Sequence, residues 1–349
     1  MSLKKNAKIK IFFCPSWIQI EEIINLTTES KKKFIFVVEN EDLYFFFKKF
    51  YLNSKIIFLK SPRTIFTVNP IKLINNFYLN YLEKKKIKFI FNKYSHTTVY
   101  CSDSFNLVQM AYAAKVLSFR NQLYLYSNKI NIEKFLKKKI GLKMFLYNIY
   151  IKMFYRISCY SVADPNHKLY SVYSDKYYKF INAKKIKNPV NILLLKKFIK
   201  KKLNLHNKIK ILLLSSFEAI ADNLLDEGKF KTWANEFVKI TDPKKIIFKR
   251  KSINEKKYFT EKLFSEAPSY LPASLLCYKV DIIVGYNSST LFQAANAGCK
   301  VISLLDLLKK EESNPNLNYY KSFLTDNLIS SKKILFPKNM NEFNKQIKT

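Results

Sequence analysis

The sequence predicts an α/β fold made of two Rossmann-like domains, with parallel sheets and an interdomain cleft. The chain has 349 residues, more than the roughly 250 to 300 at which a single hydrophobic core stops growing. Short apolar, β-rich runs alternate with longer amphipathic stretches along almost the whole length, as in parallel sheets with helices on both faces. A break at Asn188-Pro189 separates two series of these runs.

Each series predicts the strands of one sheet. The first comprises Lys8–Cys14, Phe34–Val38, Ile56–Leu59, Thr97–Cys101 and Leu123–Tyr126. The second comprises Ile209–Leu214, Ile246–Lys249, Ile282–Val284 and Val301–Leu304. Between them, the stretch 183–210 holds ten lysines and no acidic residue. We therefore place the domain boundary near residue 185, which gives domains of residues 1–185 and 186–349.

The amino-acid composition excludes several classes of protein. A hydrophobic content of 48% excludes disorder as the main state, and no run of about 18 uncharged apolar residues predicts a membrane span. Five scattered cysteines without a C-x-x-C pair argue against a zinc ribbon or disulfide framework and fit a reducing cytoplasm. The 62 basic and 26 acidic residues give a net charge of +36. Two interpretations stay open: the bias of an AT-rich genome, or an anionic substrate or lipid surface.

Two basic amphipathic segments indicate contact with an anionic membrane. In Ile132–Ile157, apolar residues recur at helical spacing among lysines, and Ile192–Leu203 repeats this pattern. The alternative for each is a helix that faces the core and carries lysines on its solvated face.

The chain has four glycines, and two of them bracket a motif with chemical meaning. Gly285 follows the strand Ile282–Val284, Asn287-Ser288-Ser289-Thr290 comes next, and Gly298 ends the helix that this turn opens. Such a turn directs backbone N–H groups and the positive end of a helix dipole toward one point beyond the strand. We expect a phosphate or carboxylate site here, and helix capping by Ser and Thr is the alternative.

Read in order, the chain resembles the bacterial lipooligosaccharide sialyltransferases and the related capsular polysialyltransferase-like proteins. Cys14-Pro15-Ser16-Trp17-Ile18-Gln19 looks like the end of their first strand and the turn after it, and 98–104 resembles their mid-domain strand. Residues 158–175 resemble their end-of-first-domain segment. The segment 271–290, which begins Leu271-Pro272 and ends with the Ser288-Ser289-Thr290 turn, is similar to their donor site.

The resemblance implies a GT-B architecture and an inverting transfer of a sialic acid or related nonulosonate from a CMP donor to a lipid-linked or cell-surface glycan. Domain 1–185 would be the acceptor side, and 186–349 would bind the CMP donor, without a metal or other cofactor. Ser288 and Ser289 would hold the CMP phosphate, assisted by Gly285, Asn287, Thr290 and Pro272. The protein would act in the cytoplasm or peripherally on the inner face of the cytoplasmic membrane.

The catalytic groups depart from the family pattern. Where the family has an acidic motif whose first carboxylate is the general base, this chain reads Ser127-Asn128-Lys129. Where the family has Lys-Pro-His-Pro, it reads Lys249-Arg250-Lys251-Ser252, so Arg250 or Lys251 would neutralise the leaving phosphate. Neither Ser127 nor Asn128 can act as a carboxylate base near neutral pH.

Three explanations for the missing base remain open. Asp103, at the end of a neighbouring strand, could replace it, although a helix N-cap is the competing role for this side chain. His167 is a second candidate base, or the base lies elsewhere. Alternatively, the protein binds nucleotide sugar or glycan without catalysis. The charge also raises the hypothesis of a nucleic-acid-binding protein, which we disfavour because the sequence lacks a nucleic-acid-binding motif.

Overall fold

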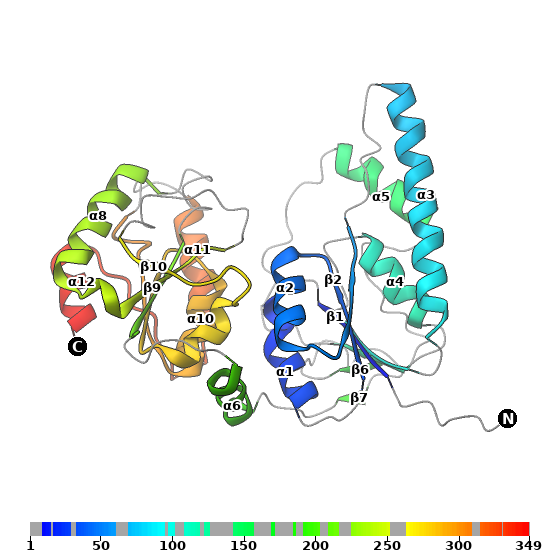
Figure 1. The fold of residues 1–349 in the computed structure, drawn as a ribbon. Coiled ribbons are helices and arrows are strands. Elements are labelled where there is room, and N and C mark those ends of the chain that lie inside the picture. Colours follow the sequence, from blue (N-terminus) through cyan, green and yellow to red (C-terminus); the bar gives the residue numbers. More distant parts are fainter. Residues whose placement is uncertain are drawn as a thin grey trace. The chain divides into compact units, whose positions relative to one another are not determined.

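The chain, described by a computed structural model, divides into two units, Met1–Asn191 and Ile192–Thr349, and each is built around its own parallel sheet (Figure 1). The predicted α/β class with two parallel sheets is confirmed. The structure describes residues 9–14, 17–28, 33–60, 69–94, 97–101, 108–118, 122–125, 142–156, 169–171, 184–185, 191–202, 209–215, 225–251, 263–308, 315–329 and 331–348.

The sheet of unit 1 has the strand order β3-β2-β1-β4-β5-β6-β7, and every neighbouring pair is parallel. The order reverses direction at β1 and β4, as in doubly wound folds. The strands are β1 Lys10–Cys14, β2 Phe34–Val38, β3 Lys55–Phe58, β4 Thr98–Cys101, β5 Gln122–Leu125, β6 Leu169–Ser171 and β7 Lys184–Lys185. The helices are η1 Trp17–Gln19, α1 Ile20–Thr28, α2 Glu41–Phe50, α3 Pro70–Asn92, α4 Val108–Ser118 and α5 Leu142–Tyr155.

Helices cover both faces of this sheet, which explains why its central strands read as continuous apolar runs. Phe12 lies on one face and stacks on Phe36, and Phe36 stacks on Phe47 of α2 at a centroid distance of 4.0 Å. Phe13 lies on the other face, in a core that includes Phe91 of α3 and residues of α4. Figure 1 shows α1 and α2 on one side of the sheet and α3, α4 and α5 on the other.

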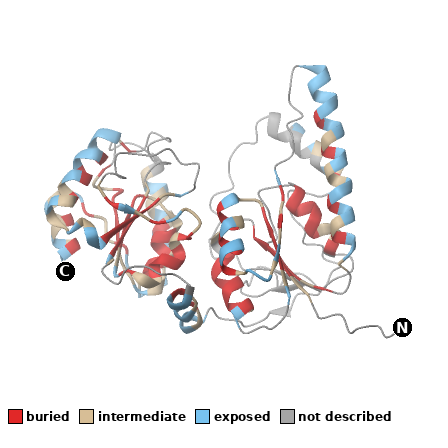
Figure 2. Cartoon of the chain, viewed as in Figure 1, coloured by how far each residue is buried: buried red, intermediate tan, exposed pale blue. Residues whose placement is uncertain are grey.

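The sheet of unit 2 has the order β10-β9-β8-β11-β12, also entirely parallel, and it reverses direction at β8 and β11. The strands are β8 Ile211–Leu214, β9 Ile246–Lys249, β10 Ser265–Glu266, β11 Ile282–Gly285 and β12 Lys300–Ser303. The helices are α6 Ile192–Lys202, α8 Glu227–Ile240, η4 Pro243–Lys245, α9 Ala273–Leu276, η6 Cys277–Lys279, α10 Ser289–Ala297, α11 Pro315–Asp326 and α12 Met340–Lys348. Figure 2 shows that the central strands and the inward faces of these helices are buried.

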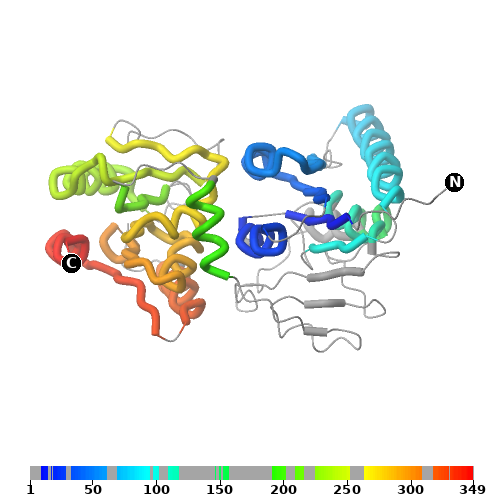
Figure 3. Tube along the Cα trace, turned by 60° about the horizontal axis from the view of Figure 1, so that its bottom comes forward, coloured from blue at the N-terminus to red at the C-terminus, as the bar shows by residue number. Residues whose placement is uncertain are grey.

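An aromatic cluster joins the last helix of unit 2 to its core. Phe237 of α8 is fully buried and lies against Trp233, Phe264 and Phe343. Phe343 belongs to α12, so this cluster attaches the C-terminal helix to α8, and the two helices lie side by side in Figures 1 and 3. On the other side of the sheet, Phe292 of α10 contacts Phe323 of α11.

The two basic segments predicted to contact a membrane are helical where the structure describes them. Of the first, α5 covers 142–155; residues 132–141 lie outside the described part of the chain. The second is α6, in which Leu195 and Ile199 are buried and the lysines at 196, 197, 200 and 201 are exposed. This is the pattern of a core-facing helix with a solvated basic face. Within the described ranges, no helix is both long and apolar enough to span a bilayer.

Candidate functional site

The carboxyl edge of the unit 2 sheet gathers the donor-site residues that the sequence predicted. All five strands are parallel, so the residues that follow each strand meet at this one edge. The strand order reverses between β8 and β11, and in open α/β sheets ligands bind outside the carboxyl ends at such a point. The turn from β11 to α10, residues 285–289, lies there.

Gly285 allows the end of β11 to pack closely against its neighbours. A Cβ atom at this position would lie 3.1 Å from Leu214 Cβ on β8 and 3.3 Å from Leu291 Cδ2 on α10. A side chain would therefore crowd Leu214 on the neighbouring strand, and β8 and β11 would have to shift slightly to relieve the contact. The glycine signal found in the sequence has this physical basis: the absence of a side chain allows the end of β11 to pack closely against β8.

Ser288 is the N-cap of α10. Its Oγ accepts the N–H of Thr290 at 3.3 Å, and the N–H of Leu291 donates to the Ser288 carbonyl at 3.0 Å. The capping alternative is therefore observed. It does not exclude anion binding, because a serine hydroxyl that accepts a hydrogen bond keeps its own O–H to donate. At the other end of α10, Gly298 adopts the left-handed conformation, with φ of 98°.

The side chains of this turn differ in their exposure. Asn287, Ser288 and Ser289 are partly exposed, whereas Thr290 is buried. At the N-terminus of a nine-residue helix, these residues and their backbone N–H groups form a partly positive end that favours a negatively charged group. The Thr290 side chain is buried and its N–H donates to Ser288 Oγ, so Thr290 takes part in the cap rather than in the exposed surface of the turn.

Hydrogen bonds between β11 and β12 fix the position of the turn. The buried Ser303 Oγ donates to the Tyr286 carbonyl at 2.7 Å, and the Leu304 N–H donates to the Gly285 carbonyl at 2.8 Å. The Tyr286 side chain is also buried, and this burial raises the pKa of its phenol well above the usual range. Tyr286 therefore stays protonated at neutral pH and serves as a packing residue beneath the turn.

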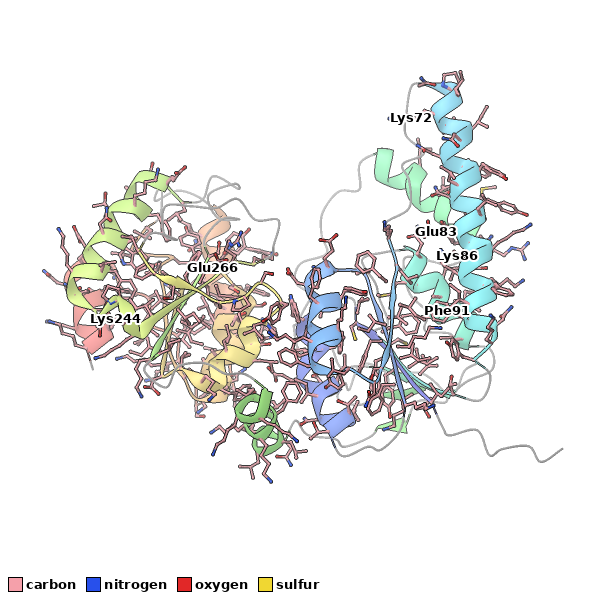
Figure 4. The ribbon with its side chains drawn as sticks, viewed as in Figure 1. Lys72, Glu83, Lys86, Phe91, Lys244 and Glu266 are labelled. Atoms are coloured by element: carbon pink, nitrogen blue, oxygen red, sulfur yellow. The ribbon has the colours of Figure 1, made fainter. Side chains whose placement is uncertain are left out.

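The end of β9 supplies the basic residues of this edge. Lys249 is only 4% exposed, and its Nζ donates to the Ser269 carbonyl at 3.1 Å and to the Arg250 carbonyl. Arg250 forms an ion pair with Glu266 of β10, labelled in Figure 4, and Lys251 is exposed. Because β8 lies between β9 and β11, these residues start about 10 Å from the α10 turn, two strand spacings away.

The buried Lys249 also positions the segment that carries Pro272. Its bond to Ser269 and the bond from the Ala267 N–H to the Phe248 carbonyl, 2.7 Å, hold the segment after β10 against the end of β9. Pro272 follows as the N-cap of α9 and is buried. These contacts make Pro272 a structural neighbour of the carboxyl edge.

Two features of this edge were not predicted from the sequence. Lys249 was predicted as the end of a strand, and its burial was not predicted. The second feature is an ion pair after β12, in which Lys321 Nζ lies 2.7 Å from Asp306 Oδ2. It joins residues 15 positions apart, so no local pattern predicts it.

The residues predicted for catalysis in unit 1 cannot be placed. Asp103, Ser127, Asn128 and His167 lie outside the described residues, and their roles remain predictions. The acidic triplet that begins at Asp226 is explained by the structure, because Asp226 caps α8 through the N–H of Lys229 at 2.9 Å. Within the described ranges, no group of three His, Cys, Asp or Glu side chains is arranged to hold a metal ion.

Neither a protein-family model nor a curated protein matches the sequence. Among solved structures, the wall teichoic acid polymerase TagF, an H444N variant soaked with CDPG, is similar over 98% of this chain and 80% of its own, at 11% identity and a TM-score of 0.48. The glycosyltransferase SnogD from Streptomyces nogalater is similar over 97% of this chain and 90% of its own chain, at 9% sequence identity and a TM-score of 0.45. A UDP-glucosyltransferase from Polygonum tinctorium is similar over 85% of this chain and 79% of its own chain, at 9% sequence identity and a TM-score of 0.42. At these values, the similarity carries no argument about function.

Proposed function

We propose that the protein is a glycosyltransferase of sialyltransferase type, which transfers a sialic acid or related nonulosonate from a CMP donor to a lipid-linked or cell-surface glycan. One observation carries the proposal: the β11–α10 turn lies at the point where the strand order of unit 2 reverses. There the N-terminus of α10, with Ser288 as its N-cap and Ser289 as its first residue, lies at the carboxyl edge of the sheet. The resemblance of this segment to the sialyltransferase donor site is the reason for choosing CMP.

A nucleoside monophosphate donor suits the β11–α10 turn as a phosphate cradle. CMP-activated sugars carry one phosphate, so one helix N-terminus with two adjacent hydroxyls provides enough donors for its oxygens. In the proposed reaction, the acceptor oxygen attacks the anomeric carbon from the face opposite the phosphate. The bond from that carbon to the phosphate oxygen breaks, and CMP leaves with the electron pair. Backbone N–H groups of the turn, and Lys251 or Arg250, would stabilise the charge on CMP.

The acceptor hydroxyl must also lose a proton, so the reaction needs a base. Asp103 and His167 are the proposed candidates. Two variants test them, Asp103→Asn and His167→Asn, with turnover of the CMP donor as the readout. A base should lower turnover by about 10²-fold or more when it is removed and leave CMP affinity unchanged.

Calorimetry tests the phosphate cradle. We expect the full chain to bind CMP more tightly than cytidine, because only CMP presents a phosphate to the turn. Ser289→Ala should remove much of this difference, since Ser289 contributes its hydroxyl without serving as the helix cap. Ser322→Ala, on the exposed surface of α11, is the matched control and should bind as the wild type does. Equal affinity for CMP and cytidine in the wild type would overturn the proposal.

A catalytically silent relative is the second candidate. It is favoured by Ser127-Asn128-Lys129, which stands where the family has its acidic base. This candidate also predicts CMP binding, but no release of CMP from a CMP-nonulosonate in the presence of glycan acceptors. Turnover that depends on Asp103 or His167 would exclude it.

A further inference from the structure

The outer face of α3 is apolar, whereas its inner face buries two asparagines. Residues 76, 80, 87 and 91 are buried and follow one another at helical spacing, and Asn80 is only 1% exposed. On the opposite face, Ile71 is 78%, Ile74 70% and Phe89 66% exposed. Figure 2 shows the exposed outer surface of this helix, and Figure 4 marks Lys72 near its start and Phe91 near its end.

A helix whose only role is to cover a core has its apolar residues on the buried face, whereas α3 buries Asn76 and Asn80 beside Ile87 and Phe91 and exposes large apolar residues on the opposite face. The exposed apolar residues Ile71, Ile74, Tyr78, Tyr81 and Leu82 follow one another at spacings of three or four positions or share a turn, and Phe89 lies seven positions after Leu82; we call these six residues the α3 stripe. The first five form one apolar surface along about 11 residues, or roughly 17 Å of helix, and Phe89 lies about two turns further along the same face, beyond the lysines at 84–86. Contiguous exposed apolar patches of this kind mark interaction surfaces.

The inner face of α3 is already occupied. Asn80 Nδ2 donates to the Tyr150 hydroxyl of α5 at 3.5 Å, and Phe77 contacts Phe154 of α5 with ring centroids 5.0 Å apart. Ile87 and Phe91 pack into the core of unit 1. Because these contacts fix the orientation of the helix, the α3 stripe cannot rotate inward, and among the described residues it stays exposed.

The charges around the α3 stripe indicate which kind of surface can bind it. Lys72, Lys85, Lys86 and Lys88 are exposed on the same helix, whose single acidic residue is Glu83. Lys85 Nζ lies 4.7 Å from the centre of the Tyr81 ring, so cations and apolar surface are directly adjacent. The complementary surface must be apolar and negatively charged at once. A second copy of this chain would bring the same lysines into contact, and their repulsion would oppose pairing.

We propose that α3 docks this protein onto a bilayer that contains anionic phospholipids, with the α3 stripe in the headgroup and acyl boundary and the lysines on lipid phosphates. Tyr and Phe side chains partition favourably at that depth, and each lysine near an anionic leaflet contributes about five-fold in affinity. The helix differs from both segments that the sequence analysis selected for membrane contact. The proposal does not depend on the donor site in unit 2.

Vesicle flotation tests the proposal. The full chain is mixed with vesicles of phosphatidylcholine, or of phosphatidylcholine and phosphatidylglycerol at a 7:3 ratio, and the protein that floats is measured. We expect strong recovery with the anionic vesicles and little with the neutral ones. Ile71→Ser with Ile74→Ser should lower the partition coefficient at least ten-fold, and Lys72→Glu with Lys86→Glu should lower it about 25-fold or more. Lys244→Glu with Lys245→Glu, exposed on η4 of unit 2, is the matched charge control and should bind as the wild type does.

Several results would overturn the proposal. Equal recovery with neutral and anionic vesicles would show that the lysines do not contribute to binding. Recovery of the Ile71→Ser, Ile74→Ser variant at the wild-type level would show that the α3 stripe does not contribute. A concentration-dependent dimer that this variant abolishes, without vesicle binding by the wild type, would show that the face pairs with a second copy. Circular dichroism and urea unfolding check that each variant folds. CMP titration of the same variants should be unchanged, so failure of docking and failure of the donor site are separable.

Discussion

Replacing Gly285 with alanine should destabilise unit 2 and weaken nucleotide binding together. The new Cβ would lie 3.1 Å from Leu214 Cβ, an atom fixed to the backbone of β8 that cannot swing away. It would also lie 3.2 Å from Leu214 Cδ1 and 3.3 Å from Leu291 Cδ2, which can yield by small rotations. Overpacking of this size costs about 1–3 kcal/mol, offset by about 0.4–1 kcal/mol from the stiffer unfolded chain. The net expectation is a loss of about 1–2 kcal/mol.

Urea unfolding followed by far-ultraviolet circular dichroism measures this loss. With a urea dependence of about 1–3 kcal/mol per molar, the midpoint should fall by roughly 0.5–1 M. Calorimetry on the same sample should show weaker CMP binding, because relief of the contact with Leu214 shifts the end of β11 and the turn that follows it. An alanine variant with the midpoint and CMP affinity of the wild type would refute the argument from close packing.

Gly298 provides the matched control at the other end of α10. A Cβ there meets nothing within 4 Å, but the residue has φ of 98°, so alanine is strained by conformation alone. We expect Gly298→Ala to cost about 1–2 kcal/mol and Gly298→Asn less, because asparagine tolerates the left-handed region. CMP affinity should be unchanged in both variants. Weakened CMP binding by Gly298→Asn would indicate that general destabilisation, rather than the position of the turn, affects the site.

Three further predictions concern unit 2. Ser303→Ala removes the bond to the buried Tyr286 carbonyl and should cost about 1–3 kcal/mol in urea unfolding, while Ser303→Thr should cost less if its hydroxyl keeps the bond. Phe237→Ala should cost about 3–5 kcal/mol and expose α12 to proteolysis, because Phe343 loses its contact with Phe237 and keeps the one with Trp233. Burial raises the pKa of the Cys299 thiol from 9.0 to about 11, so alkylation at Cys299, read by peptide mass spectrometry, should rise with a midpoint near pH 11. Because the thiol ionises at lower pH in the unfolded chain than in the folded one, the free energy of unfolding should fall as the pH rises from about 9 to 11. An alkylation midpoint near pH 9 would contradict the raised pKa of Cys299.

The strands were predictable because each sheet is covered on both faces. A buried parallel strand must be apolar at every position, so runs such as Phe34–Val38 and Ile246–Lys249 were found with the bounds that the structure gives. The missed strands, β6, β7 and β10, have only two or three residues each. Strands this short present no apolar run, and their pairing depends on the neighbouring strand.

The β11–α10 turn was predictable because its signal is local. A glycine after an apolar strand, followed by Ser288 and Ser289, fixes a strand, a turn and a helix start without reference to distant residues. The features that were missed depend on tertiary structure. Lys249 is recognisable as a buried amine only when the Ser269 carbonyl is seen beside it, and the outer position of the α3 stripe is set by packing of α3 on α5. A helix with apolar residues all around gives no periodic signal for which side will face solvent.

A crystal structure of the chain with bound CMP tests the central claim most directly. The proposed function predicts a CMP phosphate oxygen within hydrogen-bond distance of the Ser289 N–H, with the Ser288 or Ser289 hydroxyl as a second donor. A phosphate bound elsewhere, with the β11–α10 turn left unoccupied, would contradict it.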